Sequence, residues 1–268
     1  MPDSLPSWDL SDLYDDKGTA AQDDLAQVRQ RAKKLAEFSG RLAGEPGDKL
    51  AGIISEYQAI SEVLSRIISH ADLKFAADMA EAKNGQYAQD MREAAATLTS
   101  QLLFVELELA TLAEEHYQEA LKSPAFYAFQ PWLRRLREGA KYQLEPRLEQ
   151  MLVERSPAGR GAWTRLFDET AASLKFPFQG GEVSEAEILN QLTDKNPEIR
   201  KEAGLSLSGV MAENQRLFAL ILNVIAKDKE VDDRWRGFER PVSSRNLAND
   251  VDDKTVDALS VAVNARTG

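Results

Sequence analysis

The sequence predicts an all-α protein, built of long antiparallel helical hairpins in a multi-helix array, with at most one small β-hairpin near residues 174–183. Over most of the chain, apolar residues recur at steps of three and four, which is the spacing of one helix face. Glycine and proline gather in short stretches between these segments, as they do at turns. Alternating apolar residues followed by a Gly-Gly pair occur near residue 178, which is the one strand signal.

The chain begins with an aromatic arm that precedes the first helix. Residues 5–14 contain Trp8 and Tyr14 in a segment too short to be stable alone, so we expect the arm to dock its aromatic side chains on the body. Residues 19–38 then form an amphipathic helix with a polar back, and the glycines that follow end it.

Two longer helices follow the first. Asp48 is expected to cap the second, and the pair Asn84-Gly85 is expected to mark its end. The third helix is expected to run over residues 87–117. Short turns between long helices predict a stacked antiparallel arrangement.

Prolines divide the middle of the chain. Residues 132–137 read as a basic turn, Pro146 opens a helix, and Pro157 opens another. The strand signal over residues 174–183 predicts a small hairpin, which Pro177 restricts to an edge position.

The longest helical pattern lies after this hairpin. Ser184 and Glu187 form a capping box for a short helix. Asn196 is then a good N-cap and Pro197 suits the first helical position. The pattern predicts a single helix over residues 197–229, roughly 50 Å long. We interpret this helix as one wall of a large enclosure.

The last part of the chain is predicted to be irregular over residues 241–249 and helical after Asp252 or Asp253. The apolar face of this final helix has few partners left in the chain, so we expect it to fray or to self-associate; it carries Val256, Leu259 and Val263.

Composition excludes several classes of function. The chain has 268 residues, with 33 Lys and Arg against 44 Asp and Glu, so its net charge is −11 and its pI is near 4.9. An acidic protein is a poor candidate for binding nucleic acid or anionic membranes. It has no cysteine, no signal-peptide pattern at the start and no run near the ~18 apolar residues of a membrane span. We therefore expect a cytoplasmic protein.

No complete active site is legible in the sequence. The two histidines, His70 and His116, lie on different expected helices and belong to no H-E-x-x-H motif. Phosphate-binding and nucleophile-elbow motifs are also absent from the sequence. We therefore expect no catalytic residue, no metal ligand and no cofactor bound by this chain.

Two groups of arginines remain as candidates for ligand binding. They could cap helix ends and pair with neighbouring carboxylates, which is the interpretation we favour, or hold the carboxylate of a peptide. The first group consists of Arg134, Arg135 and Arg137 beside Trp132, and the second of Arg234, Arg236, Arg240 and Arg245 beside Trp235 and Phe238. The second group lies where the long helix breaks, so its candidate channel-lining residues are Arg236, Gly237, Phe238, Arg245 and Asn246.

A helical-repeat interpretation is the alternative to a peptidase. Residues 194–203 resemble the turn and second-helix start of a HEAT unit, which would make the chain a complete binding or scaffold protein without enzymatic activity. The pattern occurs once, whereas a solenoid needs several stacked units.

Several blocks of sequence together resemble one family. They occur in the same order as in oligoendopeptidase F-type zinc metallopeptidases, relatives of thimet oligopeptidase, and they span nearly the whole chain. The blocks are residues 8–14, 132–137 with 144–146, 163–169, 174–176 with the Gly-Gly turn, 196–203, 222–229, 236–238, Pro241, Arg245 and Asn246.

This resemblance implies an all-α, two-lobed shell around a channel that admits short peptides. It also implies one zinc ion held by an H-E-x-x-H motif and a downstream glutamate, all of which would lie beyond residue 268. The chain would then comprise an N-terminal helical domain, residues 1–182, and the first helices of the catalytic domain, residues 183–268. We expect such a truncated chain to be inactive and to need the C-terminal catalytic part as its partner.

Overall fold

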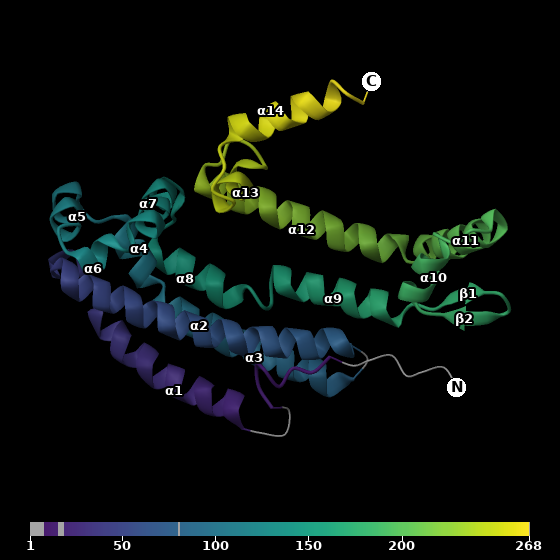
Figure 1. Ribbon diagram of the computed structural model, residues 1–268, viewed down its shortest axis with the longest axis horizontal. Coiled ribbons are helices and arrows are strands. Elements are labelled where there is room, and N and C mark those ends of the chain that lie inside the picture. The colour runs from purple at the N-terminus through teal and green to yellow at the C-terminus, as the bar shows by residue number, and fades with distance from the viewer. Residues whose placement is uncertain (1–7, 16–18, 80, 268) are drawn as a thin grey trace.

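The computed structural model of the chain describes residues 8–15, 19–79 and 81–267. Its regular structure is helical, apart from one two-stranded antiparallel sheet in the described part. The predicted all-α fold with one small hairpin is therefore confirmed. The helices lie in successive layers, from the N-terminal bundle at the bottom of Figure 1 to the last helix, which stands off at the top.

The first layer is a bundle of three long helices: α1 (Ala20–Leu35), α2 (Gly47–Ala77) and α3 (Ala82–Leu102). Each of the three contacts the other two. Two short 3₁₀ segments, η1 (Ala36–Phe38) and η2 (Leu42–Gly44), connect α1 to α2. The apolar face of α2 is the centre of the main core, where Leu50, Ile60 and Ile67 are fully buried.

Two predicted boundaries of these helices are wrong. Pro46, not Asp48, is the N-cap of α2, and the Asp48 carboxylate instead accepts a hydrogen bond from Ser123. Asn84 and Gly85 lie inside the first turns of α3, which begins at Ala82. Gly85 is buried, and a Cβ there would meet the Arg165 guanidinium at 3.0 Å. This glycine therefore permits a close helix contact and does not mark a turn.

The aromatic arm docks through only one of the two aromatic residues predicted to do so. Tyr14 is buried, and its hydroxyl donates a hydrogen bond to Asp24 Oδ2 at 2.8 Å and accepts one from Arg66 Nε at 2.9 Å. Trp8 remains 69% exposed, so the expectation that it docks is wrong. Leu5 to Ser7, which also belong to this arm, lie outside the described residues.

The third predicted helix is three helices. After α3 the chain forms α4 (Phe104–Ala110) and α5 (Glu114–Ala120), and the segment Ala82–Ala110 makes an angle of 98° with α5. Three further short elements complete this end of the bundle: α6 (Pro124–Tyr127), α7 (Gln130–Gly139) and η3 (Ala140–Tyr142). Residues 132–137, predicted as a basic turn, lie within α7, whose Leu133 is fully buried.

Among the described residues, no single helix is long and apolar enough to cross a membrane. The bent pair of Ala82–Ala110 and α5 passes such a test on length and composition alone. Its apolar side chains, among them Leu98, Leu102 and Leu109, are buried in the main core.

The second layer consists of α8 (Pro146–Arg155) and α9 (Arg160–Ser173), which follow one another across α3. Pro146 opens α8 as predicted, whereas Pro157 lies before α9, which starts at Arg160. α8 contacts α3, and α9 contacts a later helix on its other side. The second layer thus joins the N-terminal bundle to the C-terminal part of the chain.

A second, smaller core surrounds the predicted hairpin. Strands β1 (Phe176–Phe178) and β2 (Gly181–Val183) pair antiparallel, with Phe176 opposite Val183. The hairpin packs on α10 (Glu185–Gln191), which has the predicted capping box, and on α11 (Pro197–Glu213), which has the predicted Asn196 cap. The buried residues of this core are Phe176, Phe178, Ile188 and Ala203.

The helices α10 and α11 are the pair that resembles a HEAT unit. Arg200 Nη1 donates hydrogen bonds to the carbonyl oxygens of Asp194 at 2.7 Å and of Lys195 at 3.1 Å, which fixes the turn between the helices. In the described structure the pair packs on the β-hairpin and on no second pair of the same kind.

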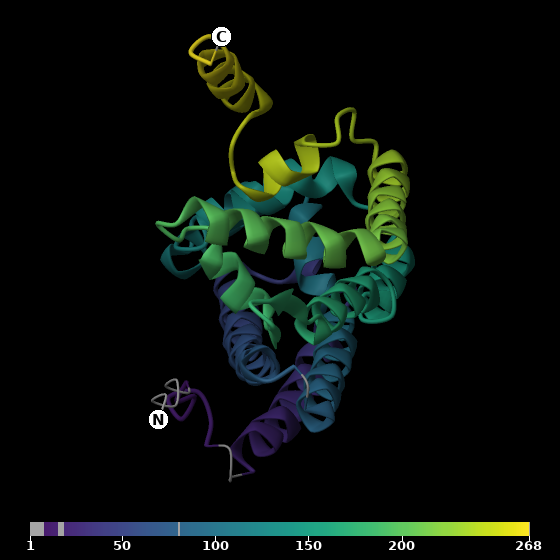
Figure 2. The ribbon, with the colours of Figure 1, turned by 90° about the vertical axis from the view of Figure 1, so that its right-hand side faces the viewer.

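The predicted 197–229 helix is not continuous. It breaks at Asn214, where α11 ends and α12 (Gln215–Arg236) begins in a different direction, as Figures 1 and 2 show. Asn214 Nδ2 donates a hydrogen bond to the Val210 carbonyl oxygen at 3.0 Å. Such a side-chain hydrogen bond competes with the backbone hydrogen bonds of a helix. The two helices also have different partners, since α11 packs on the hairpin and α12 on α9.

The chain ends in α13 (Ser243–Ala248) and α14 (Asp253–Asn264). The first of these occupies the segment predicted to be irregular. Asp252 is the N-cap of α14 and accepts a hydrogen bond from the Thr255 N–H at 2.7 Å. Of the two caps predicted for this helix, Asp252 and Asp253, the first is therefore the correct one. The apolar side of α14 is open, with Leu259 65%, Val261 69% and Val263 51% exposed.

Candidate functional site

The candidate residues of the second arginine group lie at the C-terminal end of α12. Gly237 ends this helix in the left-handed conformation, with φ 78° and ψ 27°, which glycine adopts without steric cost. The Phe238 N–H then donates to the Asp233 carbonyl oxygen at 2.9 Å, which closes the helix end. This turn directs Arg236 and Phe238 toward the second layer.

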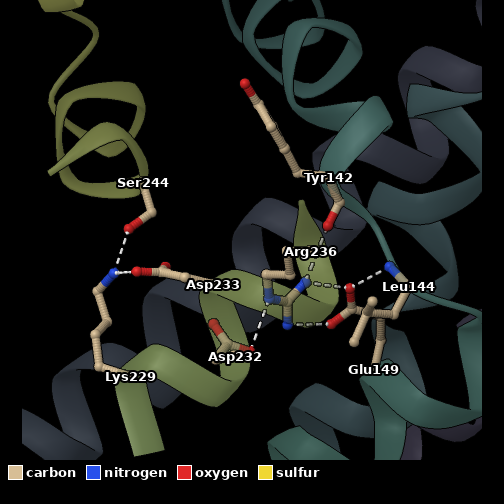
Figure 3. A network of polar contacts seen from close by, with 8 residues as sticks. All are labelled: Tyr142, Leu144, Glu149, Lys229, Asp232, Asp233, Arg236 and Ser244. Atoms are coloured by element: carbon tan, nitrogen blue, oxygen red, sulfur yellow. Dashed lines mark hydrogen bonds and ion pairs between the residues drawn. The ribbon is translucent and has the colours of Figure 1, made fainter. Parts of the chain in front are cut away.

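Arg236 joins α12 to α8 through a bidentate ion pair with Glu149 (Figure 3). Its Nη1 and Nη2 atoms donate to the two carboxylate oxygens at 2.5 Å and 2.9 Å. Nη1 also donates to the Tyr142 carbonyl oxygen at 3.3 Å, and Nε donates to Asp232 Oδ1 at 2.9 Å. The Arg236 side chain is 20% exposed and that of Glu149 11%, so this is a largely buried pair.

The electrostatics of the pair follow from these contacts. Burial raises the pKa of Glu149, but hydrogen bonds from Arg236 and from the Leu144 N–H, together with the Arg236 charge, lower it by more. The pKa of Glu149 therefore lies below its ordinary value. The hydrogen bond to Glu149 raises the pKa of Arg236 further above its usual range. Both groups are charged at neutral pH.

Phe238 adds an aromatic contact to the same joint. Its ring stacks on Tyr142, with ring centroids 4.0 Å apart and an angle of 18° between the ring planes. Tyr142 is the last residue of η3, the element that precedes α8. Arg236 and Phe238 thus bind the same turn of the chain, and this joint holds the C-terminal part against the rest.

A partly buried lysine secures the other side of the helix end. Lys229 Nζ pairs with Asp233 and donates to Ser244 Oγ at 2.9 Å and to the Pro241 carbonyl oxygen at 3.1 Å (Figure 3). Asp233 is buried, and its Oδ1 atom has no hydrogen-bond partner among the described residues. These contacts fix the loop after α12 and the start of α13.

The five candidate residues are therefore brought to one region but not to one surface. A pocket of ≈ 830 Å³ beside the joint is lined by Arg236 and Gly237, and not by Phe238, Arg245 or Asn246. Asn246 is buried, and its Nδ2 donates to Asp253 Oδ1 at 2.7 Å. Arg245 is exposed on α13.

Most of the remaining arginines of the two groups have structural partners. Arg240 forms a bidentate pair with Asp257 of α14 at 2.9 Å and 2.7 Å, and Arg234 pairs with Glu230 at 3.3 Å. In the first group, Arg137 donates to the Leu112 carbonyl oxygen at 2.7 Å and to Glu114 at 2.6 Å. Arg134 lies 3.9 Å from Glu138. These contacts agree with the capping and pairing roles that we favoured for the arginines.

Sequence reasoning missed an apolar groove between α8 and α12. The groove has a volume of ≈ 460 Å³ and lies between the face of α8 that carries Leu148, Met151 and Leu152 and the face of α12 that carries Ile225 and Trp235. Trp235 is 62% exposed and Met151 44%. The i, i+3, i+4 spacing of the α8 residues was visible in the sequence, but which helix faces them was not.

The described residues do not fit a metal site. No group of three His, Cys, Asp or Glu side chains within the described ranges is arranged to hold a metal ion. His70 is buried on α2 and its Nδ1 lies 3.1 Å from the Tyr87 hydroxyl, whereas His116 lies on α5. No chemical step through a metal is therefore derived from these residues.

Comparison with known families gives one match. Residues 108–176 match the family model described as oligopeptidase F. This segment runs from α4 through α9 into β1, and so includes Glu149 and the α8 side of the groove. No curated protein matches the sequence.

Comparison with solved structures gives the fold. Oligoendopeptidase-F from Enterococcus faecium is similar with a TM-score of 0.82 and 16% identity, covering 92% of this chain and 50% of the other. A candidate peptidase from Chlamydophila abortus is similar with a TM-score of 0.59 and 15% identity, covering 94% of this chain and 44% of the other. The chain thus spans about half the length of these structures.

Proposed function

Since residues 108–176 carry the oligopeptidase F segment, we propose that this chain is the N-terminal, non-catalytic portion of a zinc-dependent oligoendopeptidase. The parent protein would hydrolyse short peptides inside a closed channel. The observation that carries the proposal is the fold match to an oligoendopeptidase-F over 92% of this chain but only 50% of that enzyme. The resemblance found in the sequence and the fold support the same family.

The missing half would supply the chemistry. Since the described residues hold no metal-binding group, the zinc ligands of the parent would come from a C-terminal catalytic part. We propose that this part is the main partner of the chain and that it covers the open face of α14. A cytoplasmic location, without nucleic-acid or membrane partners, belongs to the same proposal and rests on composition.

We also propose that the chain divides into residues 1–182 and 183–268. Two separate clusters of buried residues support a division, one formed by residues 14–133 and one that begins at Phe176. The Arg236–Glu149 pair crosses the proposed boundary. Arg236 and Gly237, which line the pocket beside it, are the better of the five candidates for contact with a channel.

The purified 268-residue chain is expected to be inactive as a peptidase. With zinc added, it should not cleave quenched fluorescent peptides of about eight residues, because the donor groups of the described residues form no metal site. The chain extended by the residues that follow in its reading frame should cleave them, and a chelator should abolish that activity. Chelator-sensitive turnover by the chain alone would overturn the assignment of catalysis to the missing part.

The open face of α14 is expected to make the isolated chain self-associate. Its side chains at Leu259 and Val263 are 65% and 51% exposed, and burial of an apolar side chain gains about 1.5–3 kcal/mol. Light scattering after size-exclusion chromatography should show a mass that rises with concentration. Replacing both residues by Asp should give a monomer, whereas Asn264→Asp on the same helix should not. A monomer at all concentrations would contradict this expectation.

A further inference from the structure

The groove between α8 and α12 leaves apolar side chains of both helices open to solvent. One end is closed by the Arg236–Glu149 pair, and farther along, Phe167 of α9 meets Phe218 of α12 with ring centroids 5.4 Å apart. Between these two contacts, Trp235, Met151 and Leu152 are 62%, 44% and 36% exposed. Side chains of this kind are costly to leave in water, so the groove is suited to receive an apolar group.

Two cations lie at the α9 end of this groove. Arg155 is in the last turn of α8 and Arg160 is the first residue of α9, and both line the groove. Neither side chain forms a hydrogen bond or an ion pair with another residue in the described part of the chain. A cation at the first position of a helix is unfavourable, because the helix dipole is positive there. Gly159, the N-cap, gives α9 no side-chain cap either.

One carboxylate of the other helix also lines the groove. Asp228 of α12 lines the groove and likewise has no side-chain partner within the described residues. The neighbouring Lys229 and Asp232 also line the groove, but they are bound to Asp233 and Arg236. The groove therefore offers an apolar centre, two free guanidinium groups on one side and one free carboxylate on the other.

A short peptide has the matching chemistry, since it carries one carboxylate, one ammonium group and apolar side chains. We propose that this groove binds the C-terminal end of a short peptide, with a large apolar side chain against Trp235 and Leu152. The terminal carboxylate would accept hydrogen bonds from Arg155 and Arg160, a geometry that guanidinium groups favour. This inference rests on the proposed function and names the peptides that the channel would prefer.

Binding can be measured on the 268-residue chain by isothermal titration calorimetry, at a concentration at which light scattering shows a monomer. The probes are three unlabelled hexapeptides: one ending in Leu-Phe with a free carboxylate, its C-terminal amide, and one ending in Ser-Ser. We expect the free acid ending in Leu-Phe to bind at least about tenfold more tightly than either of the others.

Variants separate the two parts of the recognition. The double variant Arg155→Gln/Arg160→Gln should lose about tenfold in affinity for the free acid and nothing for the amide. Trp235→Ala should remove the preference for Leu-Phe over Ser-Ser. The matched control is Arg147→Gln, an exposed arginine of α8 that does not line the groove.

Equal binding of acid and amide would overturn the carboxylate assignment, and equal binding of all three peptides would overturn the apolar one. Absence of any binding would overturn the proposal. The groove would then be assigned to contact with the remainder of the parent protein instead. Peptidase activity of the extended chain is measured separately. If the extended chain is active and the 268-residue chain binds no peptide, only the peptide site in the groove is rejected. If the 268-residue chain binds peptide and the extended chain is inactive, only the proposed function is rejected.

Discussion

Replacement of Arg236 by alanine is expected to lower the free energy of unfolding by about 3 kcal/mol. The variant leaves the Glu149 carboxylate, whose side chain is 11% exposed, with one N–H donor, Leu144, in place of three hydrogen bonds. An uncompensated buried charge costs far more than the ion pair itself gains. Urea unfolding followed by circular dichroism measures the difference.

Arg234→Ala is the matched control for this prediction. Arg234 lies two residues earlier on the same helix, its side chain is 63% exposed, and its partner Glu230 is 50% exposed. Exposed pairs contribute about 0–1 kcal/mol, so this variant should be close to the wild type. Equal effects of the two substitutions would show that the Arg236 joint does not hold the C-terminal part of the chain.

The contribution of Glu149 should also depend on pH. Because its pKa is lowered in the folded protein from the ordinary value of 4.5, its contribution is fully present above that pH and is lost as the pH falls through the lowered value. The difference in stability between the wild type and Glu149→Gln should therefore be constant from pH 7 to about pH 5. It should shrink below about pH 4.

Local signals in the sequence located three of the helix starts that side chains cap. Ser184 with Glu187, Asn196 and Asp252 all cap the helices that they were predicted to cap. A cap satisfies backbone N–H groups within the next three residues, so its whole cause lies in a short stretch of sequence. The β-hairpin was predictable for the same reason, since a tight turn joins its two strands.

Features set by distant contacts were not predictable in this way. Gly85 looks like a turn residue in the sequence, but the constraint on it comes from Arg165, eighty residues away. Asn214 is compatible with a helix, and the chain breaks there because α11 and α12 pack on different partners. A periodic pattern reports which face is apolar, and it does not report whether one straight neighbour covers that face.

The candidate site shows the same limit. The sequence indicated that the end of the long helix at residues 236–238 was of interest, and the structure places a joint there. The sequence did not show that Arg236 is held by Glu149, because nothing in residues 236–246 specifies a partner on α8. The groove was missed because its two walls are more than sixty residues apart in the chain.

Phe176→Ala is expected to cost about 3–5 kcal/mol, the range for removing a fully buried aromatic side chain. Phe176 is at the centre of the second core, together with Ile188 and Ala203, and all three are 0% exposed. Within the described residues this core has only four buried members, and it is separate from the main cluster. A cavity there removes most of what holds the hairpin to α10 and α11.

Because the two cores are separate, the loss should appear first as local opening and not as global unfolding. Hydrogen exchange should accelerate in residues 174–211 by a factor of 100 or more, since about 1.4 kcal/mol is tenfold, while α1 to α3 keep their protection. Phe167→Ala is the control, because that side chain is 45% exposed and should cost about 1 kcal/mol. Uniform acceleration along the whole chain would show instead that the second core and the N-terminal bundle unfold as one unit, coupled through α9 and the Arg236 joint.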